Sequence, residues 1–387
     1  MSNLDHCYSV EDLIKLSKKN LPPVCYDYIT RGSDKEITLE RNKSIFDSYT
    51  FNPKILVDVS NIDLKTDIMG VQSSVPFAFA PTGMTRLFDK EGEKAVVRVA
   101  QNYGIPYCLS TVSTTSIEDV AQEAKSANLF FQLYIWKKRE WIYDFIQRSK
   151  KSGYKGFLLA VDFPVLGNRI KDKRNGQGTP RLKKNMILGA LTKPKWAIGF
   201  ISGGKLVLAN LKNWLPYGGD VQKAVETIDN QFDDSLTWQD ALDLKKEIGE
   251  NHPLYLKGIQ SVEDVVKAKE MGFSGVVISN HGGRQLDSAP TSLEILAEAR
   301  EKVGKDFEII IDGGILSGSD IIKALCLGAS SCLIGKAYLY GLSAGGEKGV
   351  DKVVNILRDD MLRTLKLIGC PSLKDLSKDY LLKTKNL

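Results

Sequence analysis

The most constraining feature of this sequence is a repeated alternation between short apolar runs and longer segments of helical periodicity. The short runs are rich in β-branched and aromatic residues, as in buried strands, and the segments between them have the apolar spacing of amphipathic helices. Eight runs are predicted as strands: Phe77–Ala80, Tyr107–Ser110, Phe130–Tyr134, Phe157–Val161, Leu254–Leu256, Val276–Ser279, Ile309–Ile311 and Cys332–Ile334. The helices predicted between them include Gly92–Asn102, Glu140–Lys151, Val262–Met271, Ser292–Lys302 and Asp320–Leu327. Eight consecutive βα units predict an α/β fold of the (β/α)8 TIM-barrel type.

A doubly wound parallel sheet is the structural alternative. That fold gathers its functional residues at one point, where the order of the strands reverses. Here, polar residues suited to chemistry follow nearly every predicted strand, which favours a closed barrel.

Two parts of the chain fall outside the repeat, although we expect residues 1–387 to form a single domain. Residues 1–75 are predicted as a lead-in of helices followed by short strands or turns, and the barrel is predicted to span 76–370. A segment at 170–234, after the fourth strand, is too long for an ordinary βα loop, so we interpret it as an insertion or lid.

Residues 183–214 of this insertion combine lysines with apolar and tryptophan side chains. The lysines are Lys183, Lys184, Lys193, Lys195, Lys205 and Lys212, and they are interspersed with residues such as Leu191, Trp196, Ile198, Ile201 and Trp214. One interpretation is an active-site lid or an oligomer contact. The other is peripheral contact with an anionic membrane, because a basic surface with tryptophan can lie at the lipid interface without crossing it.

The amino-acid composition favours some classes of binding partner and argues against others. The chain has 53 basic and 47 acidic residues, a net charge of +6, and 43% hydrophobic residues. A modest positive charge favours small anionic substrates or weak attraction to anionic lipid, and the lack of a basic repeat interleaved with aromatic residues argues against nucleic acid. The three histidines are scattered, which leaves no credible metal site. With no secretory signal and no long uncharged apolar run, we expect a cytoplasmic location, with any membrane contact on the inner face.

The run from residue 275 to 287 carries the strongest catalytic candidate. His281 and Arg284 follow a buried strand at its C-terminal end, where α/β barrels build their active sites. Asp162, after the fourth strand, is a candidate to orient His281 by accepting its second N–H, or is merely a helix cap. Arg169 and Arg284 are candidates to bind a substrate carboxylate, because guanidinium matches carboxylate geometry better than ammonium does.

Two glycine-containing turns predict a phosphate site. The seventh strand is followed by Asp312, Gly313 and Gly314, and the eighth strand by Gly335 and Lys336. Barrels frequently bind phosphate between these two loops, through backbone N–H groups and a helix N-terminus. The pattern indicates a phosphorylated cofactor or substrate.

Other strand ends also carry polar groups. Ser110, Gln132 and Tyr134 are candidates to face the barrel mouth, with surface or capping roles as the alternative. Lys257 closes an apolar strand, and in that position it can stabilise negative charge on a reduced flavin ring. No GxGxxG turn follows any strand, which disfavours a nicotinamide site.

At these residues the chain resembles the FMN-dependent 2-hydroxy acid dehydrogenase and oxidase family, which includes glycolate oxidase and L-lactate dehydrogenase. The resemblance covers nearly the whole chain, and the run from Ser279 to Gln285 is its most specific signature. The other matching segments are Leu21–Pro22, Tyr26–Tyr28, Leu56–Ser60, Ala80–Gly83, Phe131–Tyr134, Val161–Asp162 with Arg169, Leu236–Trp238 and Leu256–Gly258.

The resemblance implies a role for each candidate residue and FMN as the cofactor. His281 is implied as the base that takes a proton from the substrate, and Asp162 as the group that orients it. Arg169 and Arg284 are implied to bind the substrate carboxylate, and Tyr28 and Tyr134 to donate hydrogen bonds to the substrate. The implied FMN contacts are Pro81, Thr82, Gly83, Ser110, Gln132, Lys257, Ser279, Asp312, Gly314, Gly335 and Lys336.

The chain departs from the family pattern at four positions. Leu316 and Lys336 stand where arginine is usual, which implies weaker phosphate binding, and Ala160 stands where a hydroxyl residue is usual. Gly83 replaces the alanine common in the oxidases, and this favours a dehydrogenase.

The sequence therefore predicts oxidation of an (S)-2-hydroxy acid to the 2-oxo acid. L-lactate is expected as the substrate from the resemblance around Leu191–Phe200 and from the small Val112. A quinone, a cytochrome or O2 is expected to accept the electrons, and family analogy implies a homo-tetramer. The alternatives are an O2-using glycolate or lactate oxidase, a flavin-binding barrel without catalysis, and an unrelated phosphate-binding barrel.

Overall fold

The computed structural model describes residues 3–176, 180–215 and 227–384. Parts of the predicted insertion, residues 177–179 and 216–226, lie outside these ranges, as does the side chain of Lys183.

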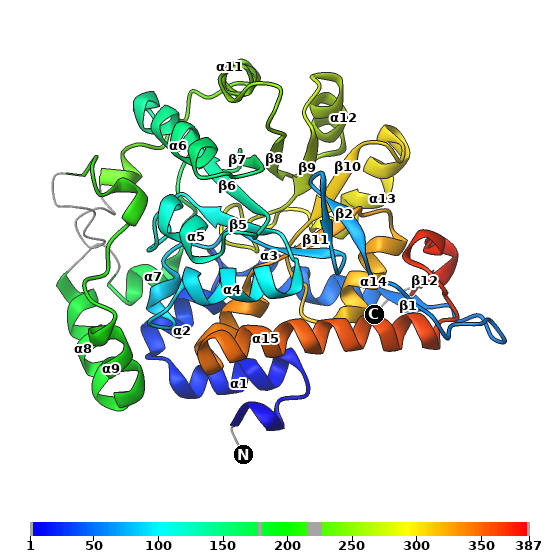
Figure 1. Ribbon diagram of the computed structural model, residues 1–387, viewed down its shortest axis with the longest axis horizontal. Helices are drawn as coiled ribbons and strands as arrows, with labels where there is room; N and C mark the ends of the chain where they lie inside the picture. The colour runs from blue at the N-terminus through cyan, green and yellow to red at the C-terminus, as the bar shows by residue number, and fades with distance from the viewer. Residues whose placement is uncertain (1–2, 177–179, 216–226, 385–387) are drawn as a thin grey trace.

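Eight parallel strands close into one barrel, which confirms the predicted (β/α)8 fold (Figure 1). Each strand pairs with the next one along the chain, and the last pairs with the first. The strands are β4 (Phe77–Phe79), β5 (Tyr107–Ser110), β6 (Leu129–Tyr134), β7 (Gly156–Ala160), β8 (Leu254–Ile259), β9 (Gly275–Ile278), β10 (Glu308–Ile311) and β11 (Ser331–Ile334). Each overlaps one of the eight predicted strands.

The barrel interior is packed with side chains, one from the middle of every strand. Together with Ile68 and Met69 they form a separate apolar cluster: Ala78, Cys108, Phe130, Leu158, Tyr255, Val277, Ile310 and Leu333. Ile68 and Met69 come from the hairpin of β2 (Thr66–Ile68) and β3 (Val71–Ser73). Because this hairpin closes the N-terminal end of the barrel, ligands can enter only at the C-terminal ends of the strands.

Helices surround the barrel, as the apolar periodicity predicts. They are α4 (Glu93–Tyr103), α5 (Ile117–Glu123), α6 (Arg139–Lys151), α11 (Trp238–Ile248), α12 (Val262–Glu270), α13 (Ser292–Val303), α14 (Gly318–Cys326) and α15 (Lys336–Leu367). Short 3-10 turns lie at Asn3–His6, Ile45–Ser48, Thr85–Leu87, Ala209–Leu211, Leu373–Asp375 and Lys378–Tyr380. The hydroxyl groups of Ser116, Ser261 and Ser317 accept hydrogen bonds from the first turns of α5, α12 and α14. These caps fix where the helices begin and hence where each strand-to-helix loop ends.

The lead-in packs back onto the end of the chain. It contains α1 (Val10–Asn20), α2 (Pro23–Thr30) and α3 (Ile37–Ser44), and α1 lies along α15 in Figure 1. The Asn20 amide donates hydrogen bonds to the backbone carbonyls of Ser343 and Ala344. Strand β1 (Tyr49–Phe51) pairs with β12 (Leu381–Lys383). These ties support the expectation of a single domain over 1–387, which stays a prediction.

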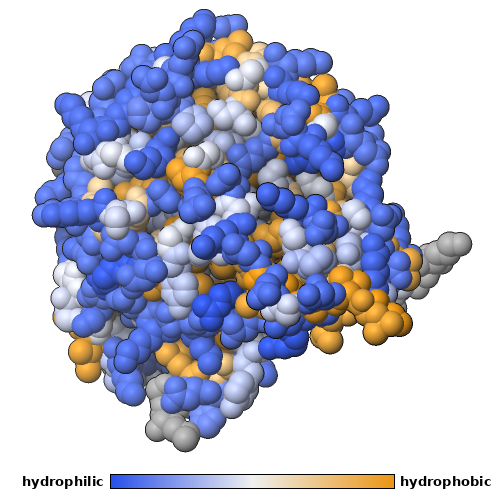
Figure 2. Space-filling view, turned by 45° about the vertical axis from the view of Figure 1, so that its right-hand side comes forward, coloured by the Kyte–Doolittle hydropathy of each residue, from blue (hydrophilic) through white to orange (hydrophobic). Residues whose placement is uncertain are grey.

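The insertion forms α7 (Ile170–Arg174), α8 (Pro180–Thr192) and α9 (Pro194–Ser202), and the last two lie at the left edge of Figure 1. Their apolar side chains include several that are exposed: Ile187, Leu188, Leu191, Ile198 and Ile201. By contrast, the face in Figure 2 is mostly hydrophilic, with apolar groups in limited patches. Within the described ranges, no helix is both long enough and apolar enough to cross a bilayer.

Candidate active site

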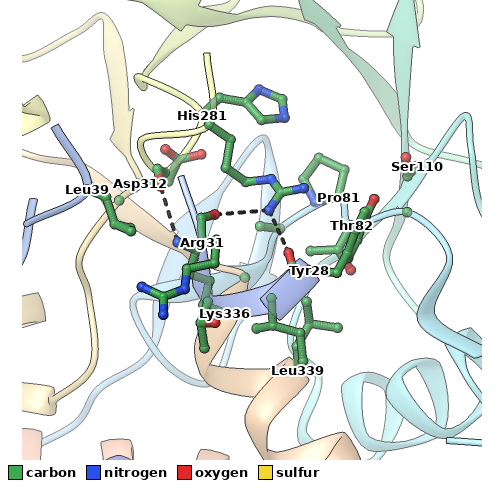
Figure 3. A pocket seen from close by; sticks show the side chains of 18 of the residues that line it. Tyr28, Arg31, Leu39, Pro81, Thr82, Ser110, His281, Asp312, Lys336 and Leu339 are labelled. Carbon is green, nitrogen blue, oxygen red and sulfur yellow. Dashed lines mark hydrogen bonds between the residues drawn. The ribbon is translucent and has the colours of Figure 1, made fainter. Parts of the chain in front are cut away.

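A cavity of about 510 Å³ opens at the C-terminal ends of the strands, and most of the predicted site residues line it. Figure 3 shows side chains from widely separated strand ends around this one pocket, among them His281, Asp312, Ser110 and Lys336. The predicted residues in its lining are Tyr28, Pro81, Thr82, Gly83, Ser110, Tyr134, Arg169, Lys257, His281, Arg284, Asp312, Gly314, Gly335 and Lys336.

The remaining predicted residues lie buried directly behind this lining. Asp162 contacts His281, and Gln132 accepts a hydrogen bond from the Ser110 hydroxyl at 3.3 Å. The Ser279 hydroxyl accepts hydrogen bonds from the Lys257 amine and from the His281 backbone N–H, each at 3.0 Å. The structure therefore brings the whole predicted set together.

His281 is held by the turn after β9. Its backbone has a φ of +59°, a left-handed conformation that is strained for a residue with a side chain. Its ring Nδ1 lies 3.0 Å from Oδ2 of Asp162. Burial lowers the pKa of His281 below the usual histidine value, although Asp162 opposes that shift. The ring is therefore neutral near pH 7, and its other nitrogen, Nε2, can accept a proton.

Asp162 is ionised despite its burial. Burial alone would raise its pKa, but the His281 ring and Lys257 keep the pKa below the usual aspartate value. Only one carboxylate oxygen bonds to His281, and the other, Oδ1, is buried without a hydrogen-bond partner in the described structure. This carboxylate can fix the ring orientation and stabilise an imidazolium.

Two arginines face the same pocket without an ion-pair partner among the described residues. The Arg284 guanidinium donates a hydrogen bond to the Tyr28 carbonyl at 2.6 Å and lies 4.7 Å from the centre of the Tyr28 ring. Arg169 donates to the Arg284 carbonyl at 3.3 Å. Burial and the nearby Arg284 lower the pKa of Arg169 to about 10. Two neighbouring guanidinium groups that form no ion pair with the described residues can bind an anion such as a carboxylate.

Lys257 joins the ends of three neighbouring strands. Its buried amine lies 2.8 Å from Oδ2 of Asp312, as well as bonding to Ser279. Burial alone would lower its pKa, but Asp312 and Asp162 raise it above the usual lysine value. A fixed positive charge therefore lies at the floor of the pocket.

Lys336 is a half-buried cation of a different kind. Its amine donates one hydrogen bond, to the Gly282 carbonyl at 3.2 Å, and it has no ion pair within the described residues. Burial, together with Arg284 and Lys43, lowers its pKa to about 7. Such a group is poised to bind an anion.

The predicted phosphate loop lies beside Lys336 and requires glycine. Gly314 has a φ of +80°, and a Cβ there would lie 1.8 Å from the Asn42 carbonyl oxygen. Glycine at this position therefore lets α3 pack directly against the loop. Leu316 lines the pocket here and supplies no charge.

Sequence reasoning missed many of the lining residues, and two groups of them bear on the chemistry of the pocket. Lys43 of α3 lines the pocket beside the phosphate loop, and nothing in the lead-in sequence predicts that position. The others are apolar: Phe163, Leu166, Leu208, Ile228 and Phe232. Phe163 is adjacent to Asp162 in the sequence, which is a usable signal, whereas the others come from the insertion or its flanks and have no recognisable spacing.

L-lactate is expected partly from the resemblance around Leu191–Phe200, and the structure does not support that part of the expectation. Residues 191–200 belong to α8 and α9 and the turn between them, and none of them lines the cavity. Val112, the other basis, does line it. Within the described ranges, no group of three or more His, Cys, Asp or Glu residues has a geometry that suits a metal ion.

Comparison with known proteins agrees with this geometry. Residues 17–383 match the family described as FMN-dependent dehydrogenase. An (S)-mandelate dehydrogenase of Pseudomonas putida is 39% identical over 375 residues, which cover 97% of this chain and 93% of the relative. An L-lactate dehydrogenase of Pseudomonas syringae pv. syringae (strain B728a) is 34% identical over 376 residues, which cover 97% of this chain and 98% of the relative.

The structural comparison gives the same family. A crystal structure of the monotopic membrane protein (S)-mandelate dehydrogenase superposes with a TM-score of 0.91 at 37% identity, covering 98% of this chain and 100% of the other. The resemblance inferred from the sequence is thereby confirmed. This chain belongs to the FMN-dependent dehydrogenase family, and it is an FMN-dependent enzyme of the 2-hydroxy acid dehydrogenase and oxidase class.

Proposed function

We propose that this enzyme oxidises an (S)-2-hydroxy acid to the corresponding 2-oxo acid, with His281 as the base. The observation that carries this proposal is the pairing of a neutral, half-buried His281 with Asp162, in the same pocket as two arginines that form no ion pair with any described residue. A proton acceptor and a carboxylate site side by side match the two polar groups of a 2-hydroxy acid.

The proton is taken up at Nε2 of His281. Nδ1 faces Asp162, so the ring donates its N–H there and presents Nε2 as the free acceptor. When the ring becomes positively charged, the Asp162 carboxylate stabilises the imidazolium. The left-handed backbone of His281 fixes the ring in this orientation.

The substrate carboxylate binds to Arg169 and Arg284. Their guanidinium groups form charge-assisted hydrogen bonds that orient the substrate, and Tyr28 and Tyr134 supply hydroxyl groups on the same side. Burial raises the pKa of Tyr134, so this hydroxyl stays protonated and can donate a hydrogen bond.

The residues of the pocket fit FMN. Lys336 and the loop at Gly314 and Gly335 would hold its phosphate, because they combine an amine without an ion pair among the described residues with a glycine-containing turn that lines the same cavity. The flavin ring would lie against a larger set: Pro81, Thr82, Gly83, Ser110, Gln132, Lys257, Ser279 and Asp312. When bound, FMN accepts the two electrons released by substrate oxidation. Lys257 supplies positive charge on that side.

L-lactate is the first substrate to test, with a quinone or a cytochrome as the electron acceptor. Gly83 favours a dehydrogenase by the resemblance to the family, and the packing here also requires glycine, because a Cβ at position 83 would lie 2.6 Å from the Val112 methyl group. The alternative is an oxidase that passes electrons to O2. The rate at which O2 reoxidises the reduced enzyme separates the two.

We also propose peripheral membrane contact through residues 183–214. The exposed apolar residues of α8 and α9 lie close in sequence to Lys184, Lys195 and Lys205, a combination that suits an anionic lipid surface. The monotopic membrane character of the solved (S)-mandelate dehydrogenase supports this proposal. The inner face of the membrane and a homo-tetramer remain predictions, which vesicle flotation and light scattering would test.

The experiment for the catalytic proposal is a visible spectrum before and after addition of a 2-hydroxy acid without oxygen. We expect a yellow protein that bleaches. A yellow protein that no 2-hydroxy acid bleaches would indicate a flavin-binding barrel without catalysis. A colourless protein that FMN does not restore would contradict the assignment of the pocket.

A further inference from the structure

The pocket has an apolar wall beside the proposed base. We define this side-chain wall by five residues that line the cavity: Phe163, Leu166, Leu208, Ile228 and Phe232. These apolar side chains do not bind the carboxylate or the hydroxyl of the substrate, or the phosphate of the flavin. It is therefore available to the part of the substrate that varies among 2-hydroxy acids.

The wall begins within contact distance of the reacting groups. The ring of Phe163 lies 4.6 Å from the ring of His281, measured between centroids. Phe232 continues the surface, with its ring 5.3 Å from Phe163 and 5.8 Å from Tyr134. A substrate whose hydroxyl meets His281 therefore directs its side chain towards aromatic surface.

Backbone pairing holds the far part of the wall in place. Phe232 forms an antiparallel bridge with the buried Trp136, which follows β6. Next to this bridge, the backbone N–H of Lys137 donates to the Gln231 carbonyl at 2.9 Å, and the Gln231 N–H donates to the Ile228 carbonyl at 2.8 Å. The wall is thus anchored to a barrel strand, which makes it a preformed surface.

The charges near the wall disfavour a second carboxylate on the substrate. Its five side chains carry no charge and no polar group that could bind an anion. Arg169 and Arg284 lie on the carboxylate side and serve the group common to all 2-hydroxy acids. An apolar side chain is therefore compatible with this subsite and an anionic one is not.

We infer that the enzyme prefers (S)-2-hydroxy acids with a large apolar, aromatic side chain over L-lactate and glycolate, with Phe163, Phe232 and Ile228 as the specificity-determining residues. This inference rests on the proposed function and deepens it. A methyl group or hydrogen in this position leaves most of the wall without a contact. Each additional buried methylene contributes roughly fourfold to binding, so the difference between small and aromatic substrates is large.

The test is anaerobic flavin reduction by a graded series of acids, followed by stopped-flow absorbance of the purified holoenzyme. The series is glycolate, L-lactate, (S)-2-hydroxy-4-methylpentanoate, (S)-mandelate, (S)-3-phenyllactate and L-malate. We expect the ratio of the limiting reduction rate to the substrate dissociation constant to be at least roughly tenfold higher for an aromatic acid than for L-lactate. L-malate should be the poorest.

The possible outcomes separate the two proposals. If L-lactate or glycolate gives the highest ratio, the inference about the wall is wrong while the proposed function stands. If L-malate ranks among the best, the charge argument is wrong. If none of the six acids reduces the flavin, the proposed function itself fails.

Substitutions of wall residues test whether the wall determines the preference for aromatic substrates. We expect Phe232→Ala to lower the aromatic-to-lactate ratio at least roughly tenfold, by removing buried contact area. Phe200→Ala is the matched control, because Phe200 stacks on Trp196 in α9 and does not line the cavity, so its ratio should match the wild type. Ile228→Ala is the second test variant if Phe232→Ala does not fold. An unchanged ratio in a folded Phe232 or Ile228 variant would overturn the assignment.

Discussion

The two ends of the pocket differ in how their charges are balanced. At the end that carries the base, His281 is paired with Asp162, and Lys257 is paired with Asp312. At the phosphate end, Lys336 is half-buried with one hydrogen bond to a carbonyl and no ion pair in the described structure. The two catalytic pairs are organised without a ligand, whereas Lys336, like the substrate-binding arginines, depends on an anion for its charge balance. Substitutions should therefore impair chemistry at the first end and cofactor binding at the second.

Removal of the base should have the largest effect and should leave the phosphate end intact. We expect His281→Ala to retain FMN but to slow flavin reduction by roughly 10³-fold or more, because no other group at this end takes the proton. Stopped-flow reduction under anaerobic conditions measures this, and the flavin-to-protein absorbance ratio is the control. Near-normal reduction in a flavin-loaded variant would contradict the role of His281.

The sequence predicted the polar residues at the strand ends more fully than the other lining residues, for a physical reason. Parallel strands of a closed barrel bring their C-terminal ends together, so residues directly after strands, such as His281 and Asp162, can be assigned to one site from strand prediction alone. The eight strands themselves were predictable because both faces are buried, which gives continuous apolar runs.

The remaining site residues reach the pocket through tertiary contacts, which the local sequence pattern does not indicate. Lys43 belongs to a helix of the lead-in, and it reaches the phosphate loop only because that helix packs against Gly314. Phe232 and Ile228 belong to the insertion, and they reach the pocket through a bridge to Trp136. Neither packing arrangement follows from periodicity, so these residues emerge only from the structure.

Removal of the lysine at the phosphate end should have the next largest effect. We expect Lys336→Met to weaken FMN binding roughly 10- to 100-fold, as for loss of one charged hydrogen bond to phosphate, and to change riboflavin binding little. Quenching of flavin fluorescence by the apoprotein measures both ligands.

The effect of Lys336→Met on FMN binding should be compared with that of Lys43→Met. Lys43 is 49% exposed and lies 3.3 Å from Glu40, so its loss should weaken FMN binding less than the loss of Lys336 does. An equal loss for FMN and riboflavin in Lys336→Met would show that Lys336 does not bind the phosphate.

The same lysine predicts that FMN binding depends on pH. The pKa of Lys336 is lowered to about 7, so above this pH the empty site holds a neutral amine, and FMN binding must be accompanied by proton uptake. The phosphate is already a dianion there, since its second pKa is about 6. We expect FMN affinity to fall by up to roughly tenfold per pH unit above pH 7. Fluorescence titration from pH 6.5 to 9 measures the slope.

Lys336→Arg is the control for the pH effect. Arginine stays protonated across this range, so its FMN affinity should be flat with pH. A wild-type slope that survives in Lys336→Arg would assign the titration to another group.

The smallest effect should come from a substitution that adds a second cation at the phosphate end. Leu316 lines the cavity beside the glycine loop and supplies no charge there. Leu316→Arg adds a second cation that cannot deprotonate, and we expect roughly 3- to 10-fold tighter FMN binding, with a shallower decline above pH 7. Leu367→Arg is the matched control, because it adds the same charge at an exposed site, 71% accessible, outside the cavity. If both variants tighten binding equally, long-range attraction explains the gain; if only Leu316→Arg does, the phosphate end is limited by its single half-buried lysine.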